Sequence, residues 1–170
     1  MFSKEKFMFE LAKVNSLELG SSEILQKGIF LWIWQPEKTP PHIGISTDGV
    51  YFSLQFEKMQ FELSVQNLFE IIERKQTSIM WLKIQVENQN IRDIFLNYVS
   101  CSLNNCSCIQ PILDVFSIRK KDAILPDLLE SLESKGIVGK LFHSYLPKKF
   151  TQINSYTRED VMEHLLNLQT

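Results

Sequence analysis

The sequence predicts an α+β fold in which a small antiparallel β-sheet or partial barrel packs against helices. Three patterns predict it: an Asp-Gly turn between two β-rich segments, a continuous apolar segment over residues 29–35, and amphipathic helical spacing over residues 64–75. Pattern alone indicates four to five strands. With 170 residues and no repeat, linker or low-complexity tract, we expect one domain spanning residues 1–170.

The first 41 residues predict two helical segments and a strand. Residues 4–15 have apolar side chains at helical spacing, and Ser21 caps another helical turn that Gly28 ends. The continuous apolar segment over residues 29–35 predicts a strand that is buried on both faces. Prolines then stop this strand and enclose a short loop; they are Pro36, Pro40 and Pro41.

Residues 42–55 predict a β-hairpin turning at Asp48-Gly49, because glycine readily adopts positive φ. A two-residue loop puts all apolar side chains on one face, whereas a three-residue loop mixes the faces. The expected apolar pairs are Thr47–Val50, Ile45–Phe52 and Ile43–Leu54. The other face then pairs Ser46 with Tyr51, Gly44 with Ser53 and His42 with Gln55. Because Gly44 has no side chain, we expect open space beside His42.

The remaining elements follow from the same periodicities. Apolar spacing of three and four predicts helices over residues 64–75 and 91–99, from Ile109 to Phe116, from Pro126 to Gly136, and from Thr157 onward. Alternation predicts strands over residues 78–86 and 137–145. Pro126 suits the first turn of its helix, and Thr157 with the acidic residues after it is typical of a capped helix start.

Composition limits the partners and the compartment. A net charge of −2 gives no reason to expect nucleic acid or an anionic membrane as a partner. The longest apolar run, residues 29–34, is too short to span a bilayer. The N-terminus has an early acidic residue and no long apolar segment, so we expect no secretory signal and a cytoplasmic location.

Three cysteines lie within eight positions, at Cys101, Cys106 and Cys108. An odd number so closely spaced is no disulfide framework, and it favours a reducing compartment or a reactive thiol. A zinc site would need a fourth ligand at suitable spacing, and the histidines are isolated. We therefore expect neither a metal nor a cofactor.

Cys106 is the candidate nucleophile. Asn104 and Asn105 precede it and an apolar helix follows, so the asparagines predict a helix cap with Cys106 at or just inside the helix start. There the helix dipole would favour thiolate, and backbone N–H groups, including that of Cys106, could hold an oxyanion. A neighbouring imidazole, His42, would complete an activated nucleophile. Cys101 and Cys108 are interpreted as packing residues, which is also the structural alternative for Cys106 itself.

These two motifs resemble those of the circularly permuted papain-like families. The segment Pro41-His42-Ile43-Gly44-Ile45 is similar to their histidine strand, and Asn105-Cys106 to their later Asn-Cys motif at a helix start. The families include the PPPDE peptidases, the lecithin retinol acyltransferase-like proteins and permuted relatives of NlpC-type peptidases. Tyr51-Phe52 resembles the aromatic strand after the histidine in the PPPDE group. The resemblance implies a permuted papain-like fold with a His42–Cys106 dyad.

The chain departs from these families at two places. It has no histidine over residues 52–54, where the retinol acyltransferase-like group uses a second one, and no small-residue motif opens the strand after Gly28. The third catalytic residue is left open. Gln55 could orient the His42 ring as an asparagine does in papain-like sites, and Ser53 is the second candidate; either is otherwise an ordinary strand residue.

Other polar and aromatic residues have structural interpretations that compete with functional ones. His143 is a rival base in the unpermuted order, but it lacks a glycine neighbour and a turn signal. His164 is expected on the exposed face of the last helix. The tryptophans could line a groove, although aromatic residues in strands are usually core; they are Trp32, Trp34 and Trp81.

The resulting hypothesis is a cysteine peptidase or amidase-type hydrolase that cleaves an amide, isopeptide or ester bond through a thioester. A thiol acyltransferase shares the same thioester chemistry, so the expected partner is a peptide, protein or acyl substrate. The alternative from another class is a non-catalytic domain on the same scaffold that binds a peptide or protein.

Overall fold

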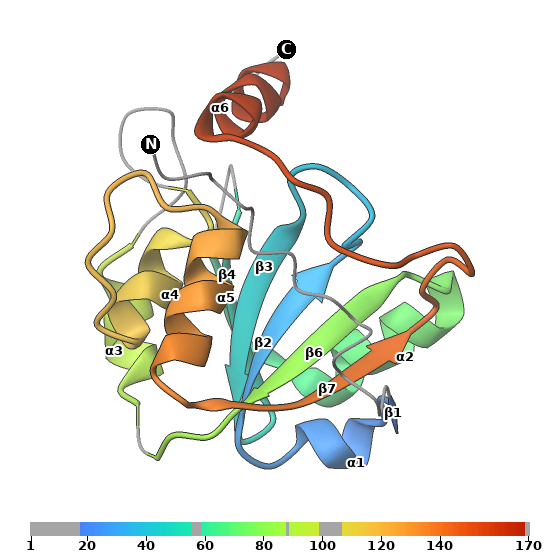
Figure 1. The fold of residues 1–170 in the computed structure, drawn as a ribbon. Helices are drawn as coiled ribbons and strands as arrows, with labels where there is room; N and C mark the ends of the chain where they lie inside the picture. Colours follow the sequence, from blue (N-terminus) through green and yellow to red (C-terminus); the bar gives the residue numbers. More distant parts are fainter. Residues whose placement is uncertain (1–17, 56–58, 88, 99–106, 169–170) are drawn as a thin grey trace.

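The described part of the chain forms one open β-sheet with helices on both faces (Figure 1). The structure is a computed structural model that describes residues 18–55, 59–87, 89–98 and 107–168. The strands are β1 (Glu18–Leu19), β2 (Ile29–Trp34), β3 (His42–Thr47), β4 (Val50–Leu54), β5 (Met59–Ser64), β6 (Ile79–Ile84) and β7 (Val138–Ser144). The helices are α1 (Ser22–Leu25), α2 (Val65–Lys75), α3 (Ile91–Leu96), α4 (Gln110–Val115), α5 (Leu125–Ser134) and α6 (Arg158–Asn167).

The strand order is β1-β7-β6-β2-β3-β4-β5, and only the β1–β7 pair among these neighbours is parallel. The α+β class and the mostly antiparallel sheet are therefore confirmed. The predicted strand number and partial barrel are wrong: seven described strands form an open sheet. Pattern reasoning missed β1, which has two residues, and β5, which it left between a hairpin and a helix. The helix expected over residues 4–15 lies outside the described residues.

The predicted hairpin register is confirmed for the three pairs next to the turn, and the described ladder does not extend to the predicted pairs Gly44–Ser53, Ile43–Leu54 and His42–Gln55. Pairs in the β3–β4 ladder are Ile45–Phe52, Ser46–Tyr51 and Thr47–Val50. Asp48 and Gly49 both have positive φ, 46° and 81°, as a two-residue turn of the primed type requires. The Asp48 carboxylate also accepts a hydrogen bond from the Gly28 N–H at 3.0 Å. This contact ties the turn to the start of β2, so the hairpin is held at its closed end.

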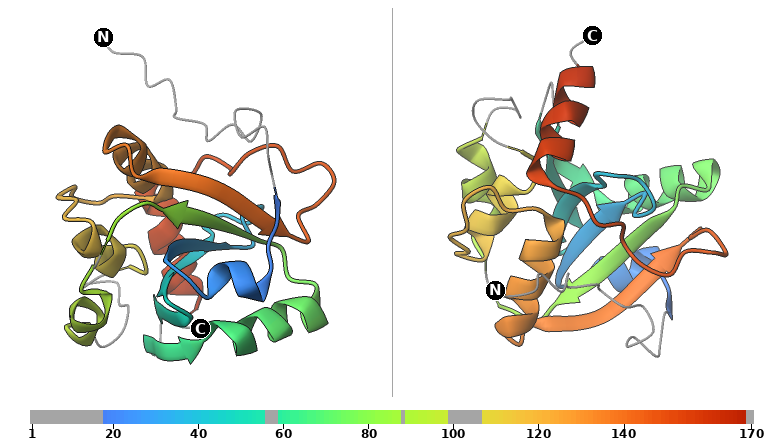
Figure 2. Two further views of the ribbon diagram at one scale, coloured as in Figure 1. Left: turned by 90° about the horizontal axis from the view of Figure 1, so that it is seen from below. Right: turned by 45° about the horizontal axis from the view of Figure 1, so that its top comes forward.

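The two faces of the sheet carry separate apolar clusters, as the residue alternation of β2 shows. Leu31 and Ile33 belong to the larger cluster, which includes apolar side chains of α3, α4 and α5. Phe30 and Trp32 belong to the other, with side chains of α1 and α2. Figure 2 shows these helices on opposite sides of the sheet. The continuous apolar sequence of β2 thus has a simple cause: helices cover both of its faces.

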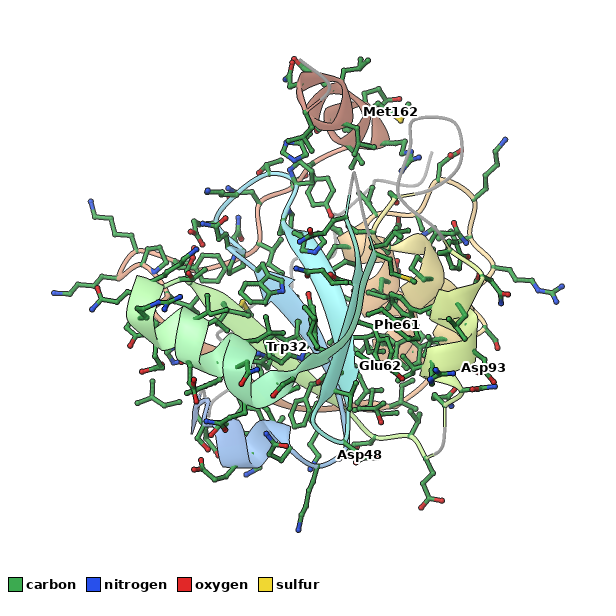
Figure 3. The ribbon with its side chains drawn as sticks, turned by 180° about the vertical axis from the view of Figure 1, so that it is seen from behind. Trp32, Asp48, Phe61, Glu62, Asp93 and Met162 are labelled. Carbon is green, nitrogen blue, oxygen red and sulfur yellow. The ribbon has the colours of Figure 1, made fainter. Side chains whose placement is uncertain are left out.

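Helix α6 stands apart from the other helices at one end of the sheet (Figure 1). In Figure 3, Met162 of α6 and Asp48 of the hairpin turn mark opposite ends of the molecule, and Trp32 lies between the sheet and α2. His42 opens β3 at the end opposite the Asp48 turn. The free end of the hairpin therefore faces the C-terminal segment.

No helix among the described residues is both long and apolar enough to cross a bilayer.

Candidate functional site

A cavity of about 410 Å³ lies where the open end of the β3–β4 hairpin meets the segment before α4, the start of α5, and α6. That volume falls in the range of ordinary small-molecule sites. Eleven of its eighteen lining residues are apolar, and they come from β3, β4, α5, α6 and the chain segments beside these elements and before α4. The polar lining residues are His42, Gln55, Ser107, Cys108, Tyr156, Arg158 and His164.

His42 is held at the cavity by its place in the sheet, where it pairs with Trp34 of β2. Its Nε2 atom is buried and has no hydrogen-bond partner among the described residues. Burial lowers the pKa of His42 from its usual 6.5 to about 4. The imidazole is therefore neutral at pH 7, which leaves it able to accept a proton or to bind a ligand group.

The open space expected over Gly44, on the face of His42, is filled. A Cβ atom at Gly44 would lie 2.2 Å from the Tyr51 hydroxyl oxygen, so the tyrosine side chain occupies that position. The Tyr51 hydroxyl accepts a hydrogen bond from the Trp34 indole at 2.8 Å. The expectation failed because it treated the second face of the hairpin as uncovered, whereas α2 and a set of aromatic rings cover it. His42 instead lines the cavity at the end of the strand.

The two candidates for orienting His42 lie differently. Ser53 is fully buried, and its hydroxyl donates to the Gln60 side-chain oxygen at 2.8 Å. Gln55 follows the end of β4 and lines the cavity together with His42. The structure gives no hydrogen bond from either residue to His42, so both roles stay predictions. Gln55 is the better placed of the two.

Cys106 and Cys101 lie outside the described residues, as does the Cys106 N–H expected to hold an oxyanion. The next two residues of the chain, Ser107 and Cys108, line the cavity that contains His42. Helix α4 begins only at Gln110 and has six residues. Cys106 therefore precedes α4 by four residues in the chain, and its expected interaction with a helix dipole stays a prediction. The tertiary fold brings Ser107 and Cys108 to the cavity that His42 also lines.

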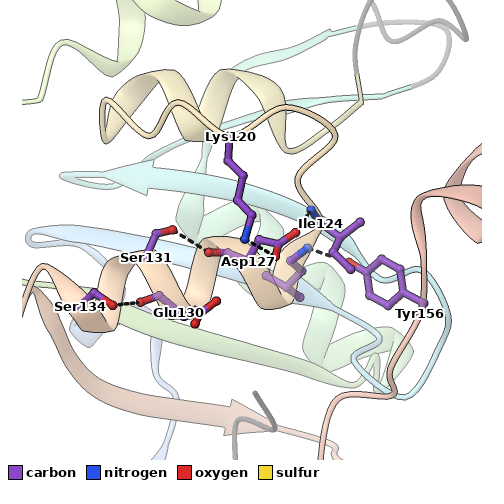
Figure 4. A network of polar contacts seen from close by, with 8 residues as sticks. Lys120, Ile124, Asp127, Glu130, Ser131, Ser134 and Tyr156 are labelled. Carbon is purple, nitrogen blue, oxygen red and sulfur yellow. Dashed lines mark hydrogen bonds and ion pairs between the residues drawn. The ribbon is translucent and has the colours of Figure 1, made fainter. Parts of the chain in front are cut away.

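Tyr156 joins the cavity wall to the start of α5. Its hydroxyl, in a side chain that is 8% exposed, accepts a hydrogen bond from the Leu125 N–H at 3.0 Å (Figure 4). The Asp127 carboxylate accepts from the neighbouring Ile124 N–H at 2.9 Å, and Lys120 pairs with the same carboxylate at 2.6 Å. Burial raises the pKa of Tyr156 well above its usual value, so the group stays protonated. The Tyr156 O–H is therefore a neutral donor at the cavity wall.

We expect Tyr156→Phe to lower the free energy of unfolding by about 1–3 kcal/mol, because the buried Leu125 N–H would lose its acceptor. Chemical denaturation measures this. Tyr145→Phe is the matched control: Tyr145 is 39% exposed and donates to Glu73 at the surface, so its loss should cost well under that amount. Equal losses in the two variants would contradict the buried role of Tyr156.

The other candidate residues lie in three different parts of the structure. His143 lies in β7 and does not line the cavity. His164 is exposed, as expected, but it lies at the cavity rim rather than away from it. Trp32 and Trp81 are fully buried core residues, and no tryptophan lines the cavity. Among the described residues, no group of three or more histidine, cysteine or acidic side chains could hold a metal ion.

Sequence reasoning missed the C-terminal wall of the cavity, which α6 and the residue before its cap supply. The cap itself was predicted: Thr157 accepts from the Asp160 N–H at 3.3 Å, and Asp160 accepts from the Thr157 N–H at 2.6 Å. One signal was available. Tyr156 and Val161 occupy the positions of a hydrophobic staple, which indicates that the chain enters α6 against an apolar surface.

Models of known protein families, curated proteins and solved structures contain no match to this chain. The likeness to permuted papain-like families consequently stands on the two sequence motifs alone.

Proposed function

We propose that this chain is a cysteine hydrolase in which His42 is the base and Cys106 the nucleophile. The observation that carries the proposal is the cavity: His42, whose Nε2 is buried and has no hydrogen-bond partner among the described residues, lines it, and so do the two residues that directly follow Cys106. Cys106 directly precedes the lining residue Ser107 in the chain.

The proposed hydrolysis uses the Cys106 thiol and the His42 imidazole. The thiolate sulfur of Cys106 attacks a carbonyl carbon, and the thiol proton passes to the neutral His42 ring. Collapse of the tetrahedral intermediate breaks the bond to the leaving group, which takes the proton from His42 and leaves a thioester. Water then attacks the thioester, with His42 again accepting a proton, and the thiol is restored. The Tyr156 O–H and the Gln55 amide are the candidate donors to the substrate oxygen.

Thiol reactivity tests this proposal. Iodoacetamide at pH 7 should label Cys106 about tenfold faster than Cys108, because an imidazole-paired thiol has a larger thiolate fraction than an ordinary one. His42→Ala should remove most of that difference. Peptide mapping by mass spectrometry gives the rate at each cysteine. The matched control is His143→Ala, which removes a partly buried strand histidine that does not line the cavity.

Equal labelling of Cys106 and Cys108, with no effect of His42→Ala, would contradict the hydrolase. One observation favours the second candidate function, a non-catalytic binding domain: burial lowers the pKa of His42 to about 4, and no described residue holds the ring as an orienting group would. A base with so low a pKa is weak unless a thiolate beside it raises the pKa again. The same experiment separates the two functions.

A further inference from the structure

The cavity is apolar over most of its wall, and the permanently charged side chain that lines it is positive. None of the described residues that line it is an aspartate or a glutamate, although the chain has 20 acidic residues. Arg158 supplies a permanent positive charge, and His164, further along the same helix, also lines the cavity. A ligand that fills this cavity would therefore meet aliphatic side chains along its length and a cation at one side.

Arg158 is available to a ligand. Its ion pair among the described residues is with Asp122, at 4.0 Å, the limit of such a contact, and the Asp122 side chain is 58% exposed. The Arg158 side chain itself is only 27% exposed because it lies against the cavity. A long, solvent-screened pair of this kind contributes little, so a better-placed anion could replace Asp122 at small cost.

We propose that the cavity binds a free amphiphile with an aliphatic chain and one anionic group, the chain lying against Ile109, Ile124 and Leu165 and the anion at Arg158. An apolar cavity of about 150 Å³ holds benzene, so about 410 Å³ has room for a chain of roughly ten carbons. As a substrate class this rests on the proposed function: the substrate is an amide or ester that carries such a chain and an anion. Binding itself needs no reaction.

Decanoate, used below its micelle-forming concentration, is the probe, and isothermal titration calorimetry with the full chain measures binding. Decanoate should bind, and octanoate should bind about tenfold more weakly because two buried methylene groups are lost. Decyltrimethylammonium should bind more weakly than decanoate, because its charge has the wrong sign for Arg158.

Two variants separate the charge from the cavity. Arg158→Gln should weaken decanoate about 5- to 10-fold and leave 1-decanol unchanged. Ala123→Phe, at a 4% exposed cavity position, should weaken both ligands, and a thermal melt checks that it folds. The matched control is Arg74→Gln, an exposed arginine of α2 on the opposite face of the sheet, which should change neither.

The outcomes distinguish this inference from the proposed function. If decanoate binding depends on Arg158 but Cys106 is unreactive, the result supports the proposed ligand class and contradicts the proposed hydrolase. If Cys106 is reactive but decanoate does not bind, or binds equally well to Arg158→Gln, the proposed ligand class is wrong and the proposed hydrolase still stands. Sedimentation with anionic lipid vesicles in the absence of decanoate binding would overturn it in favour of a membrane surface.

Discussion

Phe52→Ala should lower the free energy of unfolding by about 3–5 kcal/mol, the usual cost of truncating a buried aromatic side chain. Phe52 is 2% exposed, and its ring centroid lies 5.3 Å from that of Phe61 and 5.6 Å from that of Phe95. The residue thus joins the hairpin to its neighbouring strand and to α3. Denaturant or thermal unfolding, followed by circular dichroism, measures the loss.

Gln55→Ala is the matched variant, three residues along the same hairpin. Its side chain lines the cavity and has no place in the apolar clusters, so its loss should change stability by less than about 1 kcal/mol. A Gln55→Ala protein that melts far earlier than Phe52→Ala would contradict this assignment of faces. The same two proteins test the role of Gln55: an unchanged rate of Cys106 labelling would remove it from the proposed catalytic residues.

Stability should fall as the pH is lowered from about 6.5 to about 4, and His42 should account for up to about 3 kcal/mol of that fall. The sign follows from the lowered pKa. Between pH 6.5 and pH 4 the unfolded chain binds a proton at this histidine and the folded chain does not, so stability rises with pH across that window. Below about pH 4 both states are protonated and the contribution is constant. The other ionisable cavity groups are Cys108, Tyr156, Arg158 and His164, none of them a carboxylate that would stabilise imidazolium.

Denaturation at a series of pH values, with His42→Gln beside the unaltered chain, isolates this contribution because other titrating groups act equally in both proteins. The curve of His42→Gln should be flatter between pH 6.5 and pH 4. His143→Gln is the control: burial also lowers the pKa of His143, so it contributes in the same direction at a site remote from the cavity. Parallel curves for His42→Gln and the unaltered chain would show that the imidazole finds a counter-charge in the folded state.

The local sequence was sufficient for the elements whose signals are short in range. The Asp48-Gly49 turn and the apolar alternation around it predicted the hairpin register, because a slip of one residue would bring Ile45 and Phe52 to the wrong face. The caps at Ser21 and Thr157 were likewise readable from a few neighbouring residues, although α1 ends at Leu25, three residues before the predicted stop at Gly28. β5 also had a signal, since Met59, Phe61 and Leu63 alternate with polar residues, but a six-residue strand leading directly into a helix is easily overlooked.

The candidate site depends on contacts that no local pattern contains. The sequence identified His42 and Cys106 as candidates by residue type and motif. Tertiary packing decided the rest: helices cover both faces of the sheet, Tyr51 fills the space over Gly44, and α6 lies at the open end of the hairpin. They are decided by which apolar surfaces remain to be buried once the strands have paired, a property of the whole chain. For that reason Tyr156 and Arg158, more than 100 residues from His42 in sequence, line the same cavity.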